Sequence, residues 1–322
     1  MPEPAPPEPV SSSGPGEPPP AETAGQDTAL RQARGATLAA ALPPLEELVP
    51  EPGDSHTRQG SRARLTAELA MQRHVTLELQ RAILPLHDEP FELPGLRAVV
   101  RYLPASSASR VGGDWYIAAE LPGGHVLLAI GDVAGHGLTA AAGMARLRGA
   151  LAGLSITGAP PEQLVGWLND LARHVGLEHT ASVVAGYFDP VSKMLTWAQA
   201  GHPPPVLIRG PWARTLPQPD GILLGASSDG YTAATVQLQP GDLLLLYSDG
   251  LVERRDRSID EGLETLLMAV RDIADPELAI AAALGALGTT DPEDDTCLVA
   301  LQIIDDGTDG RPLGETPQTS AP

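Results

Sequence analysis

The sequence of 322 residues contains one cysteine, Cys297, few aromatic residues and few basic ones. One cysteine excludes an internal disulfide and any zinc site built from several cysteines. Aromatic residues make up 3% of the chain and hydrophobic residues 42%, so the core must be built mainly from Ala, Val, Leu and Ile. With 21 Lys and Arg against 41 Asp and Glu, the net charge of −20 argues against binding to nucleic acid or to anionic lipid.

Long apolar runs and several familiar motifs are also missing. No stretch approaches the ~20 residues needed to cross a bilayer, and the N-terminal sequence MPEPAPPEPVSSSGPGEPPP has neither the basic nor the apolar region of a secretory signal. We therefore expect no membrane association and a cytoplasmic location. The chain has no phosphate-binding P-loop motif. Ile303 stands where a Cys-x₅-Arg loop would need its arginine, so we expect Cys297 to be a small core residue.

Proline and polar residues dominate both ends of the chain. Nine of the first twenty residues are proline, and residues 1–60 carry too little apolar side chain to offset the entropy of folding. We predict a disordered Pro-rich tail there, with a Pro-rich docking tract as the alternative. Residues 306–322 are predicted to form a second disordered tail. The folded domain is then expected over residues 93–305.

Residues 61–92 are predicted to form a linker or regulatory segment with an amphipathic helix over 61–84. The helical part has no Gly or Pro and is ended by Pro85. One stripe of its surface is apolar, with Met71, Val75, Leu79 and Ile83 recurring every four residues. Two interpretations remain open: the helix packs on its own domain, or it forms a homodimer contact that transmits a signal.

Between residues 96 and 303 the sequence contains short β-like runs and four helical patterns. The predicted strands are 96–103, 115–120, 125–132, 180–189, 194–200, 205–209, 234–239, 242–248 and 296–303. The predicted helices are 138–154, 161–175, 259–273 and 276–287. Strands and helices are segregated along the chain rather than strictly alternating, which favours an α+β fold over a doubly wound sheet.

Aspartates stand at the ends of predicted strands, and in three of the four places a glycine adjoins the aspartate. They are Asp114 in VGGDWY, Asp132 in AIGDVAGHG, Asp249 in LYSDGL, and Asp294 or Asp295 in EDDTCLVAL. Any one of these sites alone is most simply a turn. Taken together they predict a hard oxygen site of the kind that Mg²⁺ or Mn²⁺ prefers. Two such ions can lower the pKa of a shared water, which would then attack phosphorus.

The motifs GGDWY, GDVAGHG, AGHPPPVL, LYSDGLVERRD and DDTCLVAL occur in this order. In this respect the chain resembles the SpoIIE/RsbU-type branch of the metal-dependent serine/threonine phosphatases, the PPM family. The resemblance runs from about residue 79 to residue 303. It implies a four-layer αββα sandwich, in which two antiparallel sheets are flanked by helices and the metal site lies at one end.

The resemblance also implies a set of site residues. Asp114 and Asp132 would bridge two Mn²⁺ or Mg²⁺ ions and act in catalysis. The main-chain carbonyl of Val133 would complete the coordination of one of these ions. Asp249 and Asp294 would bind the other ion. Asp295 stays open as a substitute for Asp294. All of the core carboxylates are present, which argues against an inactive copy.

Other residues near these motifs have two interpretations each. His136 is a candidate catalytic donor to the substrate phosphate or to a metal-bound water, or it caps the helix that follows. Arg110 could pair with the phosphate or lie on the surface. His202 precedes three prolines and is expected to shape its loop. Ile117 stands where family members often carry an acidic residue, so a further metal contact there is in doubt.

The expected function is that of a metal-dependent protein serine/threonine phosphatase. By resemblance, its substrate would be a phosphorylated anti-sigma-factor antagonist in bacterial partner-switching. Two rivals remain open: a partner-binding module without turnover, and a phosphohydrolase that acts on a small molecule.

Overall fold

The computed structural model describes residue 87 and residues 89–104, 112–174, 180–227, 229–254, 257–288 and 294–305. All of them belong to one compact unit of the chain, residues 62–322. The predicted tails, the predicted 61–84 helix and Arg110 lie outside the described residues. Within these ranges, no helix combines the length and the hydropathy that a membrane crossing requires.

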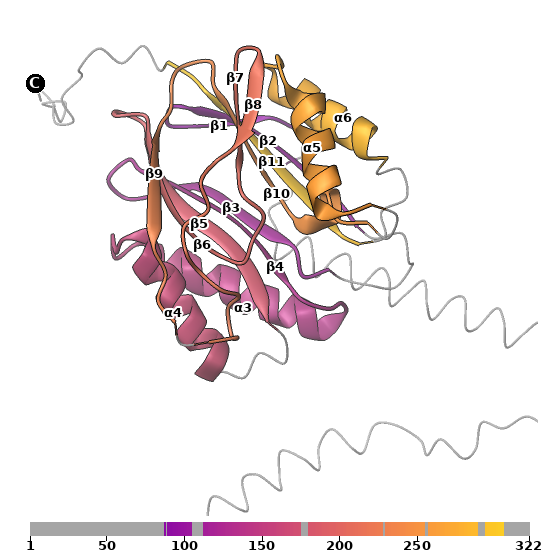
Figure 1. Cartoon of the computed structure of the whole chain (residues 1–322). Helices are drawn as coiled ribbons and strands as arrows, with labels where there is room; N and C mark the ends of the chain where they lie inside the picture. The colour runs from indigo at the N-terminus through magenta and orange to yellow at the C-terminus, as the bar shows by residue number, and fades with distance from the viewer. Residues whose placement is uncertain are drawn as a thin grey trace, which may run out of the picture. The chain divides into compact units, whose positions relative to one another are not determined.

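Two antiparallel sheets form the centre of the domain (Figure 1). The six-stranded sheet has the order β1-β2-β11-β10-β7-β8, and the five-stranded sheet has the order β3-β4-β5-β6-β9. The strands of the first sheet are β1 (Phe91–Leu93), β2 (Leu96–Leu103), β7 (Val206–Arg209), β8 (Trp212–Thr215), β10 (Leu243–Tyr247) and β11 (Thr296–Ile303). Those of the second are β3 (Trp115–Glu120), β4 (Val126–Val133), β5 (Ala181–Asp189), β6 (Met194–Ala200) and β9 (Ala233–Gln237).

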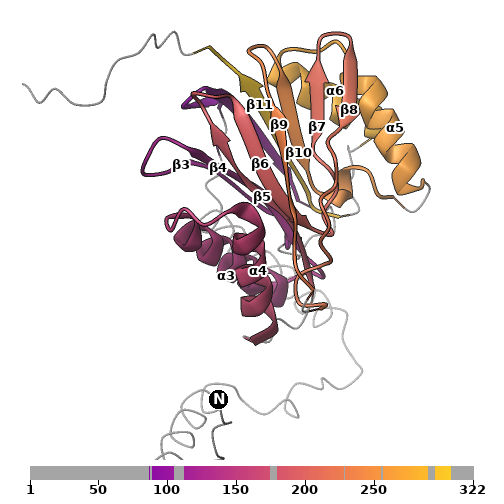
Figure 2. The ribbon, with the colours of Figure 1, turned by 60° about the vertical axis from the view of Figure 1, so that its left-hand side comes forward.

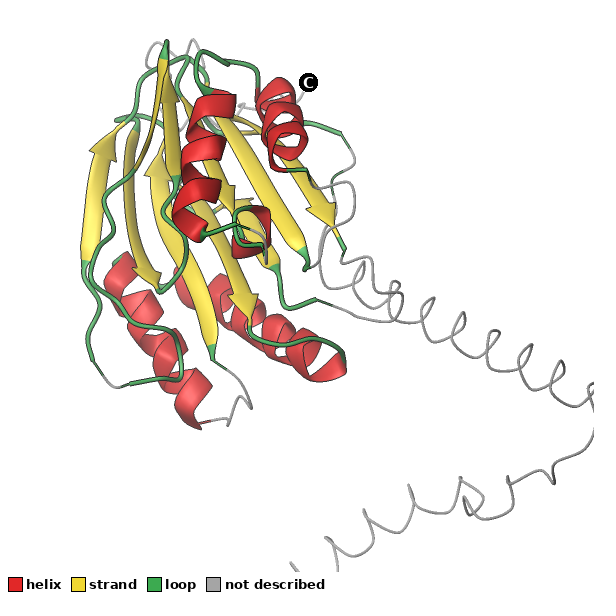
Figure 3. Ribbon diagram, turned by 45° about the vertical axis from the view of Figure 1, so that its right-hand side comes forward, coloured by secondary structure: helices red, strands yellow, loops and turns green. Residues whose placement is uncertain are grey.

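Helices cover the outer face of each sheet, as Figures 2 and 3 show. Helices α3 (Leu138–Ser155) and α4 (Pro161–His174) pack on the five-stranded sheet, against β3, β4, β5 and β6. Helices α5 (Ile259–Val270) and α6 (Pro276–Leu287) pack on each other, and α6 lies on β2 and β11. A short 3₁₀ turn, η2 (Asp249–Leu251), follows β10.

Three hydrophobic layers result from the alternation of side chains along each strand. In β4, Val126, Leu128 and Ile130 belong to the core between the two sheets. Leu127 and Ala129 belong to the layer under α3 and α4. A third layer joins the six-stranded sheet to α5 and α6. Because successive side chains of a strand point to opposite faces, strands buried on both sides read as continuous apolar runs.

Helix ends are encoded locally. Ser258 and Glu261 form a capping box at the start of α5, in which each side chain bonds the other residue's main chain. Asp275 accepts a hydrogen bond from the Leu278 amide at the start of α6, where Pro276 occupies the first turn. Gly288, with φ of 68°, ends α6 in the left-handed conformation that glycine adopts without strain.

The α+β sandwich expected from the sequence is confirmed. Its nine predicted strands begin and end within two residues of the observed ones. Helix α5 ends at Val270, before the predicted 273, because Arg271 is extended and Asp272 has a positive φ of 63°. The sequence reading missed β1 and β8. Both are short strands at the edges of the six-stranded sheet, with too few residues to show alternation.

Candidate metal centre

The predicted carboxylates lie where the apolar pattern of the inter-sheet face ends. Asp132 continues the side of β4 that carries Leu128 and Ile130 into the core between the sheets. Asp114 directly precedes β3, whose residue Tyr116 faces the same core. Since alternate residues share a face, both carboxylates are directed toward the other sheet at this end of the sandwich.

Antiparallel pairing explains why segments distant in the sequence meet there. The start of β3 lies beside the end of β4, with Trp115 opposite Gly131. In the other sheet the end of β10 lies beside the start of β11, with Tyr247 opposite Leu298. Asp249 follows the first of these strands, and the Asp294–Asp295 pair precedes the second.

A hydrogen bond joins the two sheets at this end. The Ser248 hydroxyl donates to Asp114 Oδ2 at 2.6 Å, and both side chains are buried. The pKa of Asp114 is raised well above its ordinary value, first by burial and then by the neighbouring charge of Asp132. The bond from Ser248 acts in the opposite direction, because it stabilises the ionised form.

Asp132, Asp249 and Asp294 act on one another electrostatically. Burial raises the pKa of Asp132 to about 7, and the charges of Asp249 and Asp294 contribute in the same direction. The pKa of Asp249 is also raised, by burial and by Asp294. The structure therefore brings the predicted carboxylates into one acidic cluster, in which each ionised group makes the next harder to ionise.

The two candidates at the start of β11 occupy different environments. Asp294 is exposed, and its Oδ1 accepts a hydrogen bond of 2.8 Å from the Asp295 amide. Asp295 is 5% exposed and packs against Gly112 so closely that a Cβ there would overlap its carboxylate. Asp294 is thus the accessible member of the pair beside Asp132 and Asp249, and the buried Asp295 also acts electrostatically on Asp114 and Asp132.

Gly113 has a similar role on the other side of the cluster. Its carbonyl accepts a hydrogen bond of 3.2 Å from the Val133 amide. A Cβ on Gly113 would overlap the Val133 carbonyl oxygen and lie 2.7 Å from Asp132 Oδ1. The absent side chain therefore lets the VGGDWY and GDVAGHG segments approach closely enough to set the Val133 carbonyl beside the Asp132 carboxylate.

The donor set fits a hard divalent cation. It consists of carboxylate and carbonyl oxygens, and the leading causes of the raised pKa values of Asp114, Asp132 and Asp249 are burial and neighbouring carboxylates. Such a cluster is costly without a neutralising positive charge. Among the described residues, however, no three His, Cys, Asp or Glu side chains lie close enough together to hold a metal ion as they stand. The carboxylates are neighbours rather than a finished coordination shell.

Other predicted residues occupy distinct positions. His136 is exposed, and it does not cap α3, because the N-cap residue is Gly137 and no side chain bonds the first turn. Ile117 is buried under α3 and α4, on the face turned away from the carboxylates. Cys297 is fully buried between the sheets. Its burial raises the pKa of the thiol, in agreement with a core role.

Two residues near the site were missed by the sequence reading. Ser248 lies between Tyr247 and Asp249, and Ser182 lies opposite Asp132 in the register of β4 and β5. The alternation of β5 places Ser182 on the same face as the core residue Val184. A polar residue on the apolar face of a buried strand is the signal that could have identified both.

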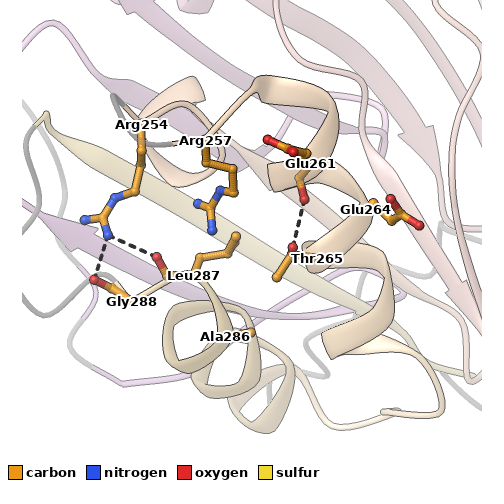
Figure 4. Close-up of a pocket in the computed structure, with 8 residues that line it drawn as sticks. All are labelled: Arg254, Arg257, Glu261, Glu264, Thr265, Ala286, Leu287 and Gly288. Atoms are coloured by element: carbon orange, nitrogen blue, oxygen red, sulfur yellow. Dashed lines mark hydrogen bonds between the residues drawn. The ribbon is translucent and has the colours of Figure 1, made fainter.

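A separate depression lies over α5 and α6 (Figure 4). Its volume is about 580 Å³, and none of the predicted site residues lines it. Arg254 donates to the carbonyls of Leu287 and Gly288, at 3.1 and 2.9 Å. This arginine therefore satisfies main-chain groups at the end of α6, and the depression is not a second acidic site.

Comparison with known proteins identifies the family. The family model described as Stage II sporulation protein E (SpoIIE) matches residues 122–304. The chain belongs to the SpoIIE family. The family resemblance seen in the sequence motifs is thereby confirmed. A curated SpoIIE-type relative, the phosphoserine phosphatase RsbU of Bacillus subtilis, is 28% identical over 151 residues. The match covers 46% of this chain and 45% of RsbU, so the chain spans less than half the length of that relative.

Two solved structures share the fold of this chain. The RsbU and RsbW domains of Rv1364c from Mycobacterium tuberculosis are 30% identical, with a TM-score of 0.61, over 66% of this chain and 61% of that one. The SiaA-PP2C domain of Pseudomonas aeruginosa is 21% identical, with a TM-score of 0.58, over 76% of this chain and 98% of that one. The second likeness supports the fold alone.

Proposed function

We propose that this SpoIIE-family chain is a metal-dependent protein serine/threonine phosphatase that hydrolyses phosphoserine or phosphothreonine. The observation that carries the proposal is the acidic cluster at the end of the sandwich, where the ends of strands from both sheets converge. RsbU, named a phosphoserine phosphatase, supports the same reaction class.

The proposed ligands divide between two Mn²⁺ or Mg²⁺ ions. Asp114 and Asp132 would bridge the pair, with the Val133 carbonyl on one ion and Asp249 and Asp294 on the other. When bound, the ions supply positive charge that lowers the pKa of a water molecule and neutralises phosphoryl oxygens. The pKa values of Asp114, Asp132 and Asp249 are raised first by burial and then by neighbouring carboxylates, and a bound cation would favour the ionised form against both effects, which supports this assignment.

The chain's own residues would then orient the phosphate and donate hydrogen bonds to it. His136 is exposed in a turn between Gly135 and Gly137, both with positive φ. We assign it the role of hydrogen-bond donor to the phosphate or the leaving oxygen. The free amides at the start of α3, with no acidic residue in the first turn, favour an anion nearby. Arg110 remains a proposed phosphate contact.

The proposed substrate is a phosphorylated protein of the anti-sigma-factor antagonist type. This assignment follows the family resemblance of the sequence motifs, and the similarity to RsbU, named a phosphoserine phosphatase, supports a phosphoserine substrate. The segment 61–92 is proposed as a regulatory linker through which two copies of the chain could associate. The phosphatase domain is proposed to span residues 93–305, between two tails.

Phosphate release from a phosphoprotein tests this function. The full chain is incubated with phosphoserine-bearing antagonist proteins and with p-nitrophenyl phosphate, with and without Mn²⁺. We expect Mn²⁺-dependent release from a phosphoprotein and loss of activity with EDTA. Turnover of the small ester alone would favour a small-molecule phosphohydrolase, and Mn²⁺-independent partner binding without turnover would favour a non-catalytic module.

A further inference from the structure

Ser248 joins three segments at the acidic end of the sandwich. Its hydroxyl donates to Asp114 Oδ2 at 2.6 Å and accepts from the Cys297 amide at 2.9 Å. Its own amide donates to the Cys297 carbonyl at 3.0 Å. The side chain is 0% exposed. Because the hydroxyl accepts from the Cys297 amide, its own proton points toward Asp114 Oδ2. The Asp114 carboxylate is therefore held in one orientation against β10 and β11.

His202 makes a second bridge between the sheets, one residue away along β10. Its Nε2 lies 3.1 Å from the Tyr247 carbonyl, and its Nδ1 lies 2.7 Å from the Ser182 hydroxyl. A carbonyl only accepts, so Nε2 carries the proton and Nδ1 accepts from Ser182. Burial lowers the pKa of His202 to about 3, which keeps the ring neutral and this tautomer fixed.

The two bridges connect the strands that deliver the carboxylates. Ser182 stands opposite Asp132 in the pairing of β4 with β5, and Tyr247 and Ser248 directly precede Asp249. Ser248 contacts Asp114 itself. The Ser248 bridge therefore ties the Asp114 segment to the end of β10, and the His202 bridge ties β5, the neighbour of the strand that carries Asp132, to the same end. The spacing of the acidic cluster across the two sheets depends on these bonds.

We propose that Ser248 and His202 are positioning residues that set the affinity of the acidic cluster for divalent cations. The inference rests on the proposed metal-dependent function. Ser248 fixes the orientation of Asp114, and His202 fixes the distance between the Asp132 and Asp249 segments. Hydrogen bonds that orient ligands from outside the first coordination shell typically alter metal affinity or activity by about 10–100-fold.

Calorimetric titration of the full chain with Mn²⁺ tests the proposal without measuring activity. Ser248→Ala removes the donor to Asp114, and Ser182→Ala removes the donor to His202 while leaving the buried ring in place. Ser155→Ala is the matched control. Ser155 is equally buried and donates to the Ala152 carbonyl at 2.9 Å, but it lies at the end of α3.

We expect the dissociation constant for Mn²⁺ to rise by about 10-fold or more in Ser248→Ala and by a smaller factor in Ser182→Ala. In Ser155→Ala the constant should stay at the wild-type value, although thermal stability falls. A steady-state assay should show reduced kcat at saturating phosphopeptide, restored in part by excess Mn²⁺.

Two results would overturn the proposal, and they are distinguishable. Wild-type chain that binds no Mn²⁺ would overturn the metal site itself and this inference with it. Wild-type binding with unchanged affinity in folded Ser248→Ala and Ser182→Ala would overturn only the positioning role. If Ser248→Ala fails to fold, unchanged affinity in Ser182→Ala alone refutes the bridge through His202, and with it the proposal.

Discussion

The layer between the two sheets has an apolar middle and an acidic end, although the same strands line both. On β4, Leu128 lies in the core between the sheets, and Asp132 lies on the same side four residues later. On β10, Leu246 packs in that core and Ser248 follows at the next inward position. The inward side of each strand is thus apolar in the middle of the layer and polar or acidic where the strand ends.

The comparison separates what folds the domain from what we propose it does. Burying Leu128 removes apolar surface from water and stabilises the sandwich. Gathering Asp114, Asp132 and Asp249 raises their pKa values and costs stability in the absence of a cation. Residues that oppose folding at one end of a well-packed layer indicate a function there.

The largest expected effect is on catalysis at the acidic end. Asp132→Asn and Asp249→Asn should each lower kcat by about 10³-fold or more, equivalent to roughly 4 kcal/mol of transition-state stabilisation. The reason is that each change removes a charged oxygen from the cluster. Phosphate release from a phosphopeptide with saturating Mn²⁺ measures it.

The matched control for those variants is Asp189→Asn. Asp189 is the last residue of β5, at the end of that strand far from the acidic cluster, where it accepts hydrogen bonds from the Ser192 hydroxyl and the Val191 amide. It should retain wild-type kcat. Equal losses of kcat in all three variants would indicate a general effect on folding. They would contradict the claim that catalysis depends on the acidic end in particular.

In the apolar middle, Leu128→Ala should instead lower stability. Leu128 is 3% exposed, and removing such a side chain from a packed core typically costs about 2–5 kcal/mol of unfolding free energy. Denaturant unfolding measures the loss. Activity per folded molecule should stay near the wild-type level. A selective loss of kcat with little loss of stability would contradict the assignment of stability to the apolar middle and of catalysis to the acidic end.

Chelator-treated protein should show an unusual dependence of stability on pH. The folded pKa of Asp132, about 7, lies above its ordinary value of 3.8. The folded state therefore keeps a proton that the unfolded chain has lost. The stabilising contribution is full below the ordinary value and is lost as pH rises through about 7.

Thermal melts between pH 5 and 8 measure this dependence. In EDTA the Tm should fall as pH rises, and Mn²⁺ should oppose the fall because it binds the ionised carboxylates. Asp132→Asn should weaken the dependence in EDTA. A Tm in EDTA that rises steadily over this range in the wild-type chain would contradict the repulsion assigned to the cluster.

The smallest effect is expected from the N-terminal tail. Deleting residues 1–60 should leave kcat for a phosphopeptide within about twofold and the Tm unchanged, because we predict no folded structure there. Phosphatase assay and calorimetry of the truncated chain measure both. A marked loss of Tm would show that the segment packs on the domain.

The sequence predicted most of the fold because its strands are long and apolar on one or both faces. The run at 243–246 in β10 and the run at 126–130 in β4 needed no tertiary information. The sequence did not predict β8, because the four residues Trp212–Thr215 show no clear strand pattern. The segment forms a strand through its pairing with β7.

The sequence also predicted acidic residues that the structure brings together, but not the contacts that support them. Strand ends and adjacent glycines singled out Asp114, Asp132 and Asp249. Whether Asp294 or Asp295 is accessible depends on the packing of Asp295 against Gly112, a residue about 180 positions earlier. The bond from Ser248 to Asp114 spans 134 positions and likewise follows only from the stacking of the two sheets.

The central claim is that the acidic end of the sandwich holds divalent cations. Crystals grown with Mn²⁺, with diffraction recorded at the manganese edge, test it most directly. The account predicts two anomalous peaks within ligand distance of Asp114, Asp132, Asp249 and Asp294, one of them also beside the Val133 carbonyl. Manganese bound only elsewhere, with these carboxylates unliganded at millimolar Mn²⁺, would contradict it.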